Sequence, residues 1–418
     1  MTTARQHPRV RLGQARGPGA PLVLLLVPLL VSLLASCGTL PGASTTAHAK
    51  PVGNGDFHHP GVVVSKAQLD TARDRVNAGK QPWLSSYLAM RDSKYGSLAY
   101  RATPFATVQC PPDTRPGHGC VEERQDAVAA YTQALLWYIT RDRQHAAKAE
   151  QIMDAWSAEV KRHTDGNAGL QTAWAGSTWA RAAEIVRHTG AGWPEPRVHR
   201  FETMLRTAYL PEVDKKVPDY NGNWDLAMTD AAIAIAVFLD DHRTFDTSLA
   251  RFKSRVPAYF YLSSDGKSPR TVPGSSSRTP RQIDTYWFGQ NVYADGLGQE
   301  TCRNFMHVGY SLAATGHIAE TAWHQGVDLY SGVKDRLKAA LEFHSRYQLG
   351  ARAPGWLCGG KVERTLGPDL EVDANHLENR LHLSLPQTDK LNRRTRPAGT
   401  DDLFVAWETL THDDSPGK

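Results

Sequence analysis

Residues 126–140 read Asp-Ala-Val-Ala-Ala-Tyr-Thr-Gln-Ala-Leu-Leu-Trp-Tyr-Ile-Thr, and this stretch sets the pattern for much of the chain. Its apolar residues recur every three to four positions, which is the period of an α-helix. A second helical stretch, from His145 to Arg162, follows after the short polar break Arg141-Asp-Arg. Two helices joined by so short a break favour an antiparallel hairpin.

The same alternation of helix and short break continues in both directions. Helices are expected to open at Ser65 and Pro82, and a last group is expected between Leu370 and the C-terminus. Further helices are predicted at 170–188, 196–209, 224–239, 244–261, within a segment that ends at Ala319, and at 334–348. Convincing strand-like runs do not occur between them, which disfavours a parallel α/β sheet. We therefore predict an all-α fold, an incomplete (α/α) toroid of antiparallel hairpins in a single domain.

The N-terminus has the features of an export signal. Residues 1–36 hold four arginines and no acid before an apolar stretch. They end at Leu-Ala-Ser-Cys-Gly, which resembles a bacterial lipobox, so Cys37 is the expected lipidation site. Residues 37–58 are predicted to form a flexible tether, and residues 59–412 the folded domain. We expect an exported protein at the cell surface or outside the cell, with membrane contact only through that lipid.

The net charge gives little reason to expect a nucleic-acid partner. The formal value is +5, and removal of the four signal-peptide arginines leaves about +1. The remaining chain of about 380 residues is long enough to bury a large core.

Four cysteines remain in the domain, and an exported chain with an even number of them is expected to form disulfides. Cys110 and Cys120 flank a Pro/Gly-rich loop and are the expected local pair. Cys302 and Cys358 then pair by elimination. Neither Cys-x-x-Cys nor His-x-x-x-His spacing occurs, so no metal site and no cofactor are expected.

The segment 290–310 reads Gln-Asn-Val-Tyr-Ala-Asp-Gly-Leu-Gly-Gln-Glu-Thr-Cys-Arg-Asn-Phe-Met-His-Val-Gly-Tyr and concentrates ionisable groups. If its second half is helical, Glu300, Arg303, His307 and Tyr310 share one continuous face. That face would carry a carboxylate, a cation, an imidazole and a phenol. Such a combination predicts a catalytic site, and the short stretch Asn223-Trp224 at another helix start is the candidate partner.

These residues carry a resemblance to the alginate lyase superfamily of bacterial polysaccharide lyases. The sequence matches its Glu-x-x-Arg pattern at Glu300 and Arg303, with a Tyr seven residues later at Tyr310, and its Asn-rich helix start at Asn223. Weaker matches are His59-Pro-Gly, Gln81-Pro-Trp and Asn375-His376, so the resemblance extends over about residues 60–410. In one branch of the family a His follows the key Asn. Here Trp224 follows it, and the imidazole is expected from His307, with His376 second.

The resemblance implies β-elimination on a 4-linked polyuronate, either alginate or glucuronan. Tyr310 would take the C-5 proton and return it to the glycosidic oxygen, provided that a nearby cation lowers its pKa. Asn223, His307 and Arg303 would neutralise the substrate carboxylate, and Glu300 would hold Arg303 in place. The expected partner is thus an anionic polysaccharide. Further sugar contacts are expected from Trp224, Asn291, Tyr293, Gln299, Asn375 and His376.

Two other interpretations fit the same sequence. A glycoside hydrolase would use two carboxylates, for example Glu300 with Asp225, Asp230 or Asp295. A surface lipoprotein that only captures polysaccharide would need no catalytic group. The hydrolase gives no required task to the aligned Arg, His and Tyr. The capture protein would bind polymer equally well without the Tyr310 hydroxyl.

Overall fold

The structure is a computed structural model that describes residues 56–111, 117–277 and 279–413. The predicted signal peptide, Cys37 and nearly all of the predicted tether lie outside these residues. The described residues all belong to one compact unit. None of the helices in these ranges combines the length and the apolar character that a membrane crossing needs.

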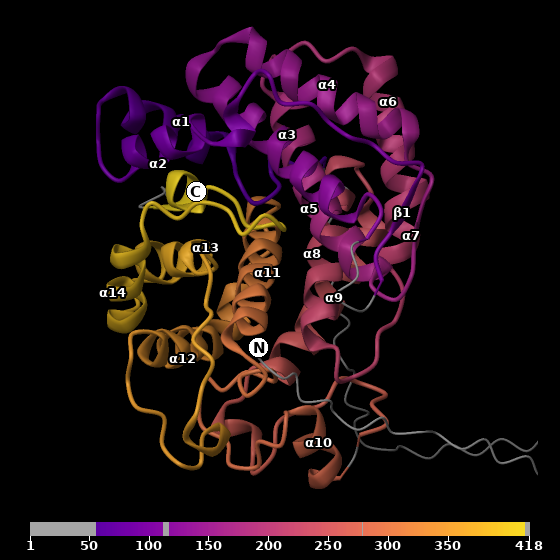
Figure 1. Ribbon diagram of the computed structural model, residues 1–418. Helices are drawn as coiled ribbons and strands as arrows, with labels where there is room; N and C mark the ends of the chain where they lie inside the picture. Colours follow the sequence, from indigo (N-terminus) through magenta and orange to yellow (C-terminus); the bar gives the residue numbers. More distant parts are fainter. Residues whose placement is uncertain (1–55, 112–116, 278, 414–418) are drawn as a thin grey trace, which may run out of the picture. The chain divides into compact units, whose positions relative to one another are not determined.

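An inner series of helices forms the centre of the fold (Figure 1). Each helix of this series packs against the next: α3 against α5, α5 against α8, α8 against α11, and α11 against α13. The series consists of α3 (Cys120–Thr140), α5 (Ala168–His188), α8 (Gly222–Phe238), α11 (Phe305–His324) and α13 (Glu371–Asn375).

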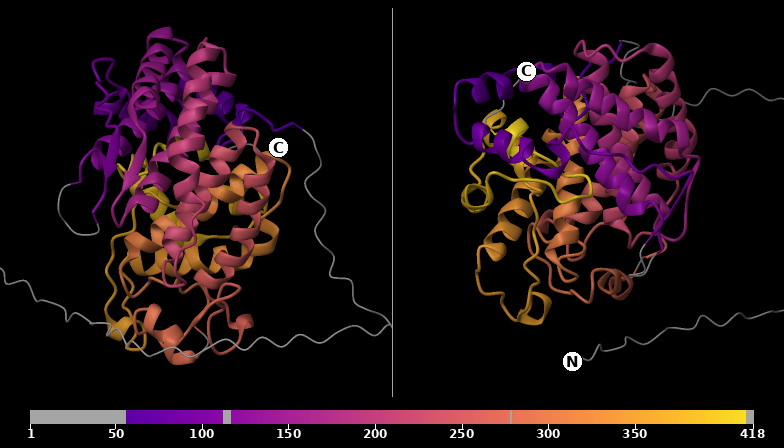
Figure 2. Two further views of the ribbon diagram at one scale, coloured as in Figure 1. Left: turned by 90° about the vertical axis from the view of Figure 1, so that its right-hand side faces the viewer. Right: turned by 45° about the horizontal axis from the view of Figure 1, so that its top comes forward.

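An outer helix follows each inner helix in the sequence and returns in the opposite direction, so the chain builds successive hairpins (Figure 2). The fold is therefore the incomplete α/α toroid that the sequence predicts. The outer helices are α4 (Arg143–Glu159), α6 (Glu195–Met204), α7 (Leu210–Val213), α9 (His242–Tyr259), α12 (Tyr330–Gln348) and α14 (Pro386–Thr395).

The inner and outer helices differ in which faces they bury. Every residue from Leu226 to Phe238 of α8 is buried, because α5, α9 and α11 all pack against this helix. In α9 the buried apolar residues recur at Phe245, Leu249, Phe252 and Val256, a spacing of three to four. That spacing marks a helix with one core-facing side.

Two hairpin turns have the same local structure. Arg141 after α3 and Asp240 after α8 both have a positive φ, which ends the helix. The next residue is an aspartate in each case: the Asp142 carboxylate accepts the Gln144 N–H of α4, and Asp241 accepts the Thr244 N–H of α9. These short turns keep the two helices of each hairpin adjacent.

Smaller elements complete the unit. The C-terminal α15 packs against both α13 and α1, and α1 packs against α3, so the two ends of the described chain lie beside each other (Figure 1). Two three-residue strands, β1 and β2, pair in parallel. The bounds are α1 (Lys66–Asn77), α2 (Trp83–Arg91), β1 (Thr107–Gln109), β2 (Arg162–Thr164), α10 (Pro280–Tyr286) and α15 (Glu408–His412).

Candidate active site

The polar segment before Tyr310 is a turn followed by a helix, which corrects the continuous helical face expected from the sequence. Helix α11 begins at Phe305, and Asn304 is its N-cap. The Asn304 side chain accepts the backbone N–H of His307 at 3.1 Å, which fixes the helix start. Glu300 and Arg303 therefore lie in the preceding turn, while His307 and Tyr310 lie in the first turns of α11.

Glu300 holds the Arg303 side chain in place within this turn. The carboxylate is only 3% exposed, and its Oε1 accepts a hydrogen bond from Arg303 Nη1 at 2.8 Å. The Tyr259 hydroxyl donates to Oε2 at 3.0 Å. Burial raises the pKa of Glu300, and these donors oppose that rise. The Arg303 side chain is 42% exposed, so a cation that Glu300 holds in place reaches the surface.

Asn223 joins the start of α8 to α11. Its Nδ2 donates to the His307 carbonyl at 2.9 Å and lies 3.1 Å from Ser311 Oγ. These partners stand on either side of Tyr310 in the sequence, so the structure brings Asn223 to the same part of α11. Its Oδ1 is buried and has no hydrogen-bond partner among the described residues. The amide thus faces the helix and keeps one acceptor unused.

The close approach of α8 depends on Gly222. A Cβ at this position would lie 2.1 Å from Gln299 Oε1 and 2.5 Å from the Tyr259 ring. Both contacts are far shorter than van der Waals distance. Glycine therefore allows the first turn of α8 to lie against the residues that surround Glu300.

His307 is held as a neutral imidazole in one tautomer. Its Nδ1 lies 2.6 Å from Asn304 Oδ1, which already accepts the His307 backbone N–H. Because an amide oxygen only accepts, Nδ1 carries the proton and Nε2 keeps a lone pair. Burial and the nearby Arg303 cation lower the pKa of His307 to about 4. At neutral pH this side chain is a hydrogen-bond acceptor, rather than the cation that could neutralise a carboxylate.

Tyr310 lies among aromatic rings and is half-buried. Its ring centroid is 6.0 Å from that of Trp174, 6.0 Å from that of Phe404 and 6.1 Å from that of His307. Burial, together with the charges of Asp401 and Asp369, raises the pKa of the Tyr310 hydroxyl, against the opposing effect of Arg124. The phenol therefore holds its proton in the free protein.

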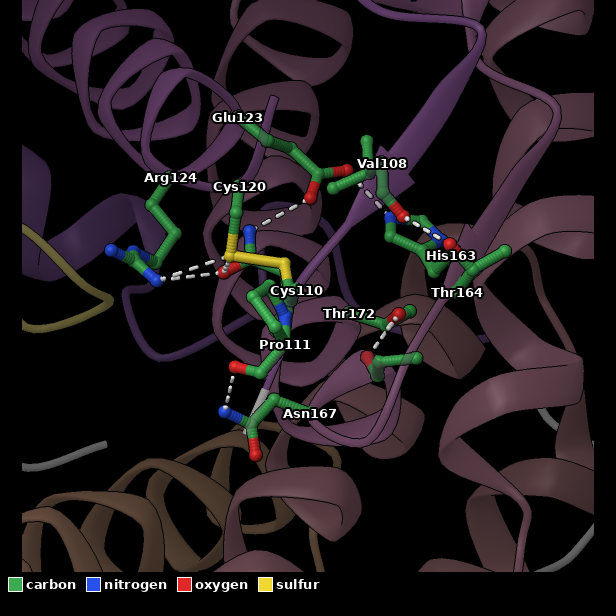
Figure 3. The surroundings of a disulfide bond; sticks show 12 residues. Val108, Cys110, Pro111, Cys120, Glu123, Arg124, His163, Thr164, Asn167 and Thr172 are labelled. Carbon is green, nitrogen blue, oxygen red and sulfur yellow. Dashed lines mark hydrogen bonds and ion pairs between the residues drawn. A yellow bond between two sulfur atoms is a disulfide. The ribbon is translucent and has the colours of Figure 1, made fainter. Parts of the chain in front are cut away.

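Arg124, Gln171 and Trp174 extend this site from α3 and α5, and the sequence pattern did not single them out as site residues. Arg124 Nη1 donates to Gln171 Oε1 at 2.8 Å, and its guanidinium lies 5.6 Å from the centroid of the Trp174 ring. Figure 3 shows Arg124 beside the Cys110–Cys120 disulfide. The spacing of Gln171 and Trp174, one helical turn apart, was the available signal.

Both expected cysteine pairs are bonded in the structure. Cys110 and Cys120 have Cα atoms 5.6 Å apart, and Cys302 and Cys358 have Cα atoms 5.1 Å apart. The second bond joins the turn before α11 to a later loop. It restrains the residue directly before Arg303.

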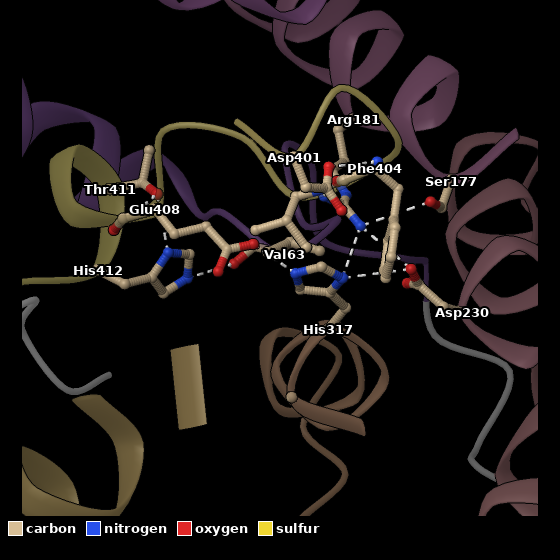
Figure 4. A network of polar contacts seen from close by, with 12 residues as sticks. Val63, Ser177, Arg181, Asp230, His317, Asp401, Phe404, Glu408, Thr411 and His412 are labelled. Atoms are coloured by element: carbon tan, nitrogen blue, oxygen red, sulfur yellow. Dashed lines mark hydrogen bonds and ion pairs between the residues drawn. The ribbon is translucent and has the colours of Figure 1, made fainter. Parts of the chain in front are cut away.

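A buried polar network packs beside Phe404, one of the rings around Tyr310 (Figure 4). His317, two turns after Tyr310 on α11, lies between Asp230 at 3.3 Å and Glu408 at 2.6 Å. Arg181 lies 3.1 Å from Asp230 and donates to the Phe404 carbonyl at 2.8 Å. The network thereby fixes Phe404, whose ring contacts both Tyr310 and His317.

The remaining sequence-predicted sugar contacts are dispersed. Trp224 is partly buried against the main core, and Asn291 lines a separate cavity beside the Cys302–Cys358 disulfide. Tyr293 donates to Asp284 at 2.6 Å, and Gln299 is buried with its Nε2 3.3 Å from the Asp219 carbonyl. These bonds engage the Tyr293 hydroxyl and Gln299 Nε2 within the protein, while Gln299 Oε1 is buried without a hydrogen-bond partner among the described residues.

Asn375 and His376 are buried away from solvent. The His376 ring stacks on Tyr330 at 3.5 Å, and its Nδ1 lies 3.3 Å from Glu320. Asn375 accepts a hydrogen bond from Asn379 at 2.8 Å. A fully covered imidazole cannot reach a polymer, so we do not include these two residues in the site. This leaves His307 as the imidazole beside Tyr310.

Comparison with known proteins now identifies the family. A family model described as alginate lyase matches residues 112–353, which is more than half of the chain. This chain belongs to the alginate lyase family. Membership makes it a polysaccharide lyase. A search of curated proteins finds no match.

Solved alginate lyases share the fold. Alginate lyase A1-III from Sphingomonas species A1 is 16% identical with a TM-score of 0.55, covering 88% of this chain and 99% of that one. A Tyr-to-Phe variant of A1-III complexed with tetrasaccharide is 17% identical, with a TM-score of 0.57 and coverage of 88% and 100%. An alginate lyase from Bacteroides ovatus is 12% identical, with a TM-score of 0.56 and coverage of 85% and 99%.

Three of the four carboxylates that a hydrolase could use are held by side chains of this alginate lyase family member, and the fourth, Asp295, accepts the Ser263 N–H at 2.5 Å. Asp225 is bound by Arg251 at 2.8 Å and by Arg255 at 2.7 Å. Asp230 belongs to the buried His317 network, and Glu300 is bound by Arg303 and Tyr259. This arrangement agrees with family membership in favouring a lyase.

Proposed function

We propose that this lyase cleaves a 4-linked polyuronate by β-elimination at the site formed by Arg303, His307 and Tyr310. The observation that carries the proposal is the pair on α11: the His307 imidazole, whose Nδ1 is bound by Asn304 so that Nε2 keeps its lone pair, has its ring centroid 6.1 Å from that of the Tyr310 phenol. One group can accept a proton and its neighbour can donate one. β-Elimination needs both within reach of one sugar ring.

The substrate carboxylate is the first requirement of the reaction. The C-5 proton is weakly acidic while the adjacent carboxylate stays negative, and removal of the proton adds further negative charge. A cation that faces the carboxylate stabilises this developing charge. Arg303 is suited to that task because Glu300 holds its guanidinium through Nη1 while the side chain stays 42% exposed. Arg124 is a second cation near Tyr310.

The two proton transfers are divided between His307 and Tyr310. The C-5 proton passes to His307 Nε2, the C–H electron pair forms the C4=C5 double bond, and the C4–O bond breaks. Tyr310 gives its proton to the departing glycosidic oxygen. The sequence suggested Tyr310 as both base and acid. Its raised pKa keeps the hydroxyl protonated at neutral pH, so the phenol starts as the donor, whereas His307 Nε2 already carries a lone pair. Solvent exchange then returns the starting protonation states.

Asn223 is assigned a positioning role in this scheme. Its amide is bonded to the His307 carbonyl and lies beside Ser311 Oγ, so it holds the first turns of α11 against the start of α8. A rotation that freed Nδ2 would allow it to donate to the substrate carboxylate, as expected from the family resemblance. In either arrangement, loss of the amide would displace His307.

The stereochemistry of the sugar bears on the choice of substrate. His307 and Tyr310 are one turn apart on α11, so they approach a bound ring from the same side. In mannuronate and glucuronate, H-5 and O-4 lie on the same face of the ring, whereas in guluronate they lie on opposite faces. We therefore propose mannuronate-rich alginate or glucuronan as substrate.

A panel of purified polymannuronate, polyguluronate and glucuronan tests this function. A lyase leaves a 4,5-unsaturated uronate that absorbs ultraviolet light, whereas a hydrolase leaves none. We expect ultraviolet absorbance to grow with polymannuronate or glucuronan. If all three polymers stay intact, the proposed substrate class is wrong.

We also propose that the protein is exported and anchored through lipid on Cys37, which lies outside the described residues. The support is the signal-like sequence before it. A Cys37→Ser variant should move from the membrane fraction to the soluble fraction. An unchanged distribution would contradict the anchor.

A further inference from the structure

Three side chains of types that can bind metal ions meet at the end of α5, apart from the proposed active site. They are His59, Glu184 and His188. His59 Nδ1 lies 2.9 Å from Glu184 Oε1, and His188 Nε2 lies 3.7 Å from the same oxygen. One ligand atom from each residue lies within 4.8 Å of the other two.

The fold brings these residues together from distant parts of the chain. Glu184 and His188 are four residues apart in the last turns of α5, so their side chains project from one face of the helix. His59 precedes Glu184 by 125 positions and belongs to the segment before α1. Its ring stacks on that of His188 at 4.2 Å with an interplanar angle of 12°. Both imidazoles are therefore held beside the carboxylate.

One nitrogen of this cluster lacks a hydrogen-bond partner among the described residues. The Glu184 side chain is 0% exposed, and its carboxylate is bound by His59 and by the Gly61 N–H. His188 Nε2 is a buried atom without a hydrogen-bond partner in the part of the chain that the structure describes. An unused nitrogen lone pair that faces a buried carboxylate is the arrangement that a cation would satisfy.

The surrounding bonds orient the cluster as outer-shell contacts orient metal ligands. His59 Nε2 lies 3.2 Å from Asp240 Oδ1 and Nδ1 lies 2.9 Å from Glu184 Oε1, so both ring nitrogens face carboxylate acceptors. A metal ion at Nδ1 would replace the proton there, while Asp240 holds the proton on the far nitrogen. The Gly61 N–H donates to Glu184 Oε2 at 2.9 Å, which leaves Oε1 toward the histidines. These contacts select the three atoms that face each other.

We propose that His59, Glu184 and His188 bind a divalent transition-metal ion of the zinc class. Two imidazoles and one carboxylate suit zinc, cobalt or nickel better than calcium or magnesium, which prefer oxygen ligands. Zinc bonds of about 2.0 to 2.1 Å place tetrahedral ligand atoms about 3.3 Å apart. The observed separations of 2.9 and 3.7 Å lie on either side of that value. Water would complete the coordination.

The ion would join three parts of the fold rather than take part in elimination. Glu184 is ten residues after Trp174 on α5, about 15 Å along the helix axis from the ring that contacts Tyr310. The ion would link the segment before α1 to the end of α5 and, through Asp240, to the turn after α8. The site therefore stabilises the N-terminal part of the domain.

Zinc titration of the chelator-stripped full chain tests this site. We expect one equivalent to bind and the melting temperature to rise with zinc concentration. Cobalt should give the visible absorption of a tetrahedral nitrogen and oxygen site. His188→Ala should lose the zinc-dependent rise in melting temperature and the cobalt absorption. The variant should still fold, because the His59–Glu184 ion pair remains. Asp240→Asn should weaken binding about 10- to 100-fold.

His199→Ala is the matched control, because His199 forms an exposed pair with Glu202 one turn away on α6. It should bind zinc like the unmodified chain. The absence of zinc binding, or equal binding by His188→Ala, would show that the cluster is only a buried ion pair. Elimination activity should persist in His188→Ala, so failure here is distinct from failure of the proposed lyase reaction.

Discussion

His307 Nδ1 and Asn304 Oδ1 lie 2.6 Å apart, so the residue that caps α11 also sets the tautomer of the imidazole beside Tyr310. The same oxygen accepts the His307 backbone N–H. A helix cap and a catalytic orientation thus depend on one side chain.

Replacement of Asn304 by Ala should separate these two effects. Loss of the cap should lower the free energy of unfolding by about 1 kcal/mol. Loss of the Nδ1 acceptor should also let the imidazole rotate, so kcat should fall by about tenfold or more. Asp142→Ala, which removes the cap of α4, is the control and should lower stability without lowering kcat. Equal kcat values for the two variants would argue against the tautomer role.

The cation at Arg303 should contribute to the acidic limit of activity. Burial and the nearby Arg303 cation lower the pKa of His307 to about 4, so the neutral base persists well below pH 6.5. Arg303→Gln removes one cause of that shift, and the acidic limb of kcat/KM should move to higher pH. Arg303→Lys keeps the positive charge, so the acidic limb of kcat/KM should stay at the same pH. Arg270→Gln, at another half-exposed arginine that is paired with Asp265, should change neither.

The same shift predicts a stability change with pH. An unfolded His307 binds a proton below about pH 6.5, whereas the folded side chain does so only near pH 4. The unfolded state therefore holds more protons between these values, and stability should fall as pH falls from about 6.5 toward 4. Urea unfolding at several pH values measures this. His307→Gln should make the dependence shallower.

Tyr310→Phe tests the proposed acid directly. The variant should retain polymer binding, because the ring contacts with Trp174 and Phe404 remain. Its kcat should fall about 10²- to 10⁴-fold, the range for a lost acid or base. Unsaturated product and polymer binding are measured separately. Tyr220→Phe, at a tyrosine that is 57% exposed, is the control and should retain activity. Normal turnover of Tyr310→Phe would remove the phenol from the mechanism.

The sequence predicted the helical hairpins because their information is local. Apolar spacing and short polar breaks determine each pair, and the (α/α) arrangement follows from them. The segment before Tyr310 was predicted less well, because its polar spacing fits a helix while Asn304 ends that pattern with a cap. Polar residues occur both in turns and in helices, so their spacing alone did not locate the helix start.

Contacts across the fold carried little sequence signal. Asn223 lies 84 residues from His307. Arg124 lies two residues before the stretch 126–140 that the periodicity predicts as a helix, and that pattern does not mark it as a site residue. Asn375 and His376 resembled site residues in sequence, yet packing against Tyr330 buries the imidazole. Three-dimensional packing decides these cases, and local pattern does not record it.

Gly222 provides a test of how tightly the site is packed. A Cβ in Gly222→Ala would overlap Gln299 and Tyr259, so the variant should lose about 1 to 3 kcal/mol of unfolding free energy. Activity should fall with it, since Asn223 and Glu300 would shift. Gly332→Ala in α12 is the matched control: its Cβ meets nothing within 4 Å, and helix propensity should make it neutral or slightly stabilising. If both variants unfold at the same urea concentration, α8 does not approach Tyr259 as closely as described.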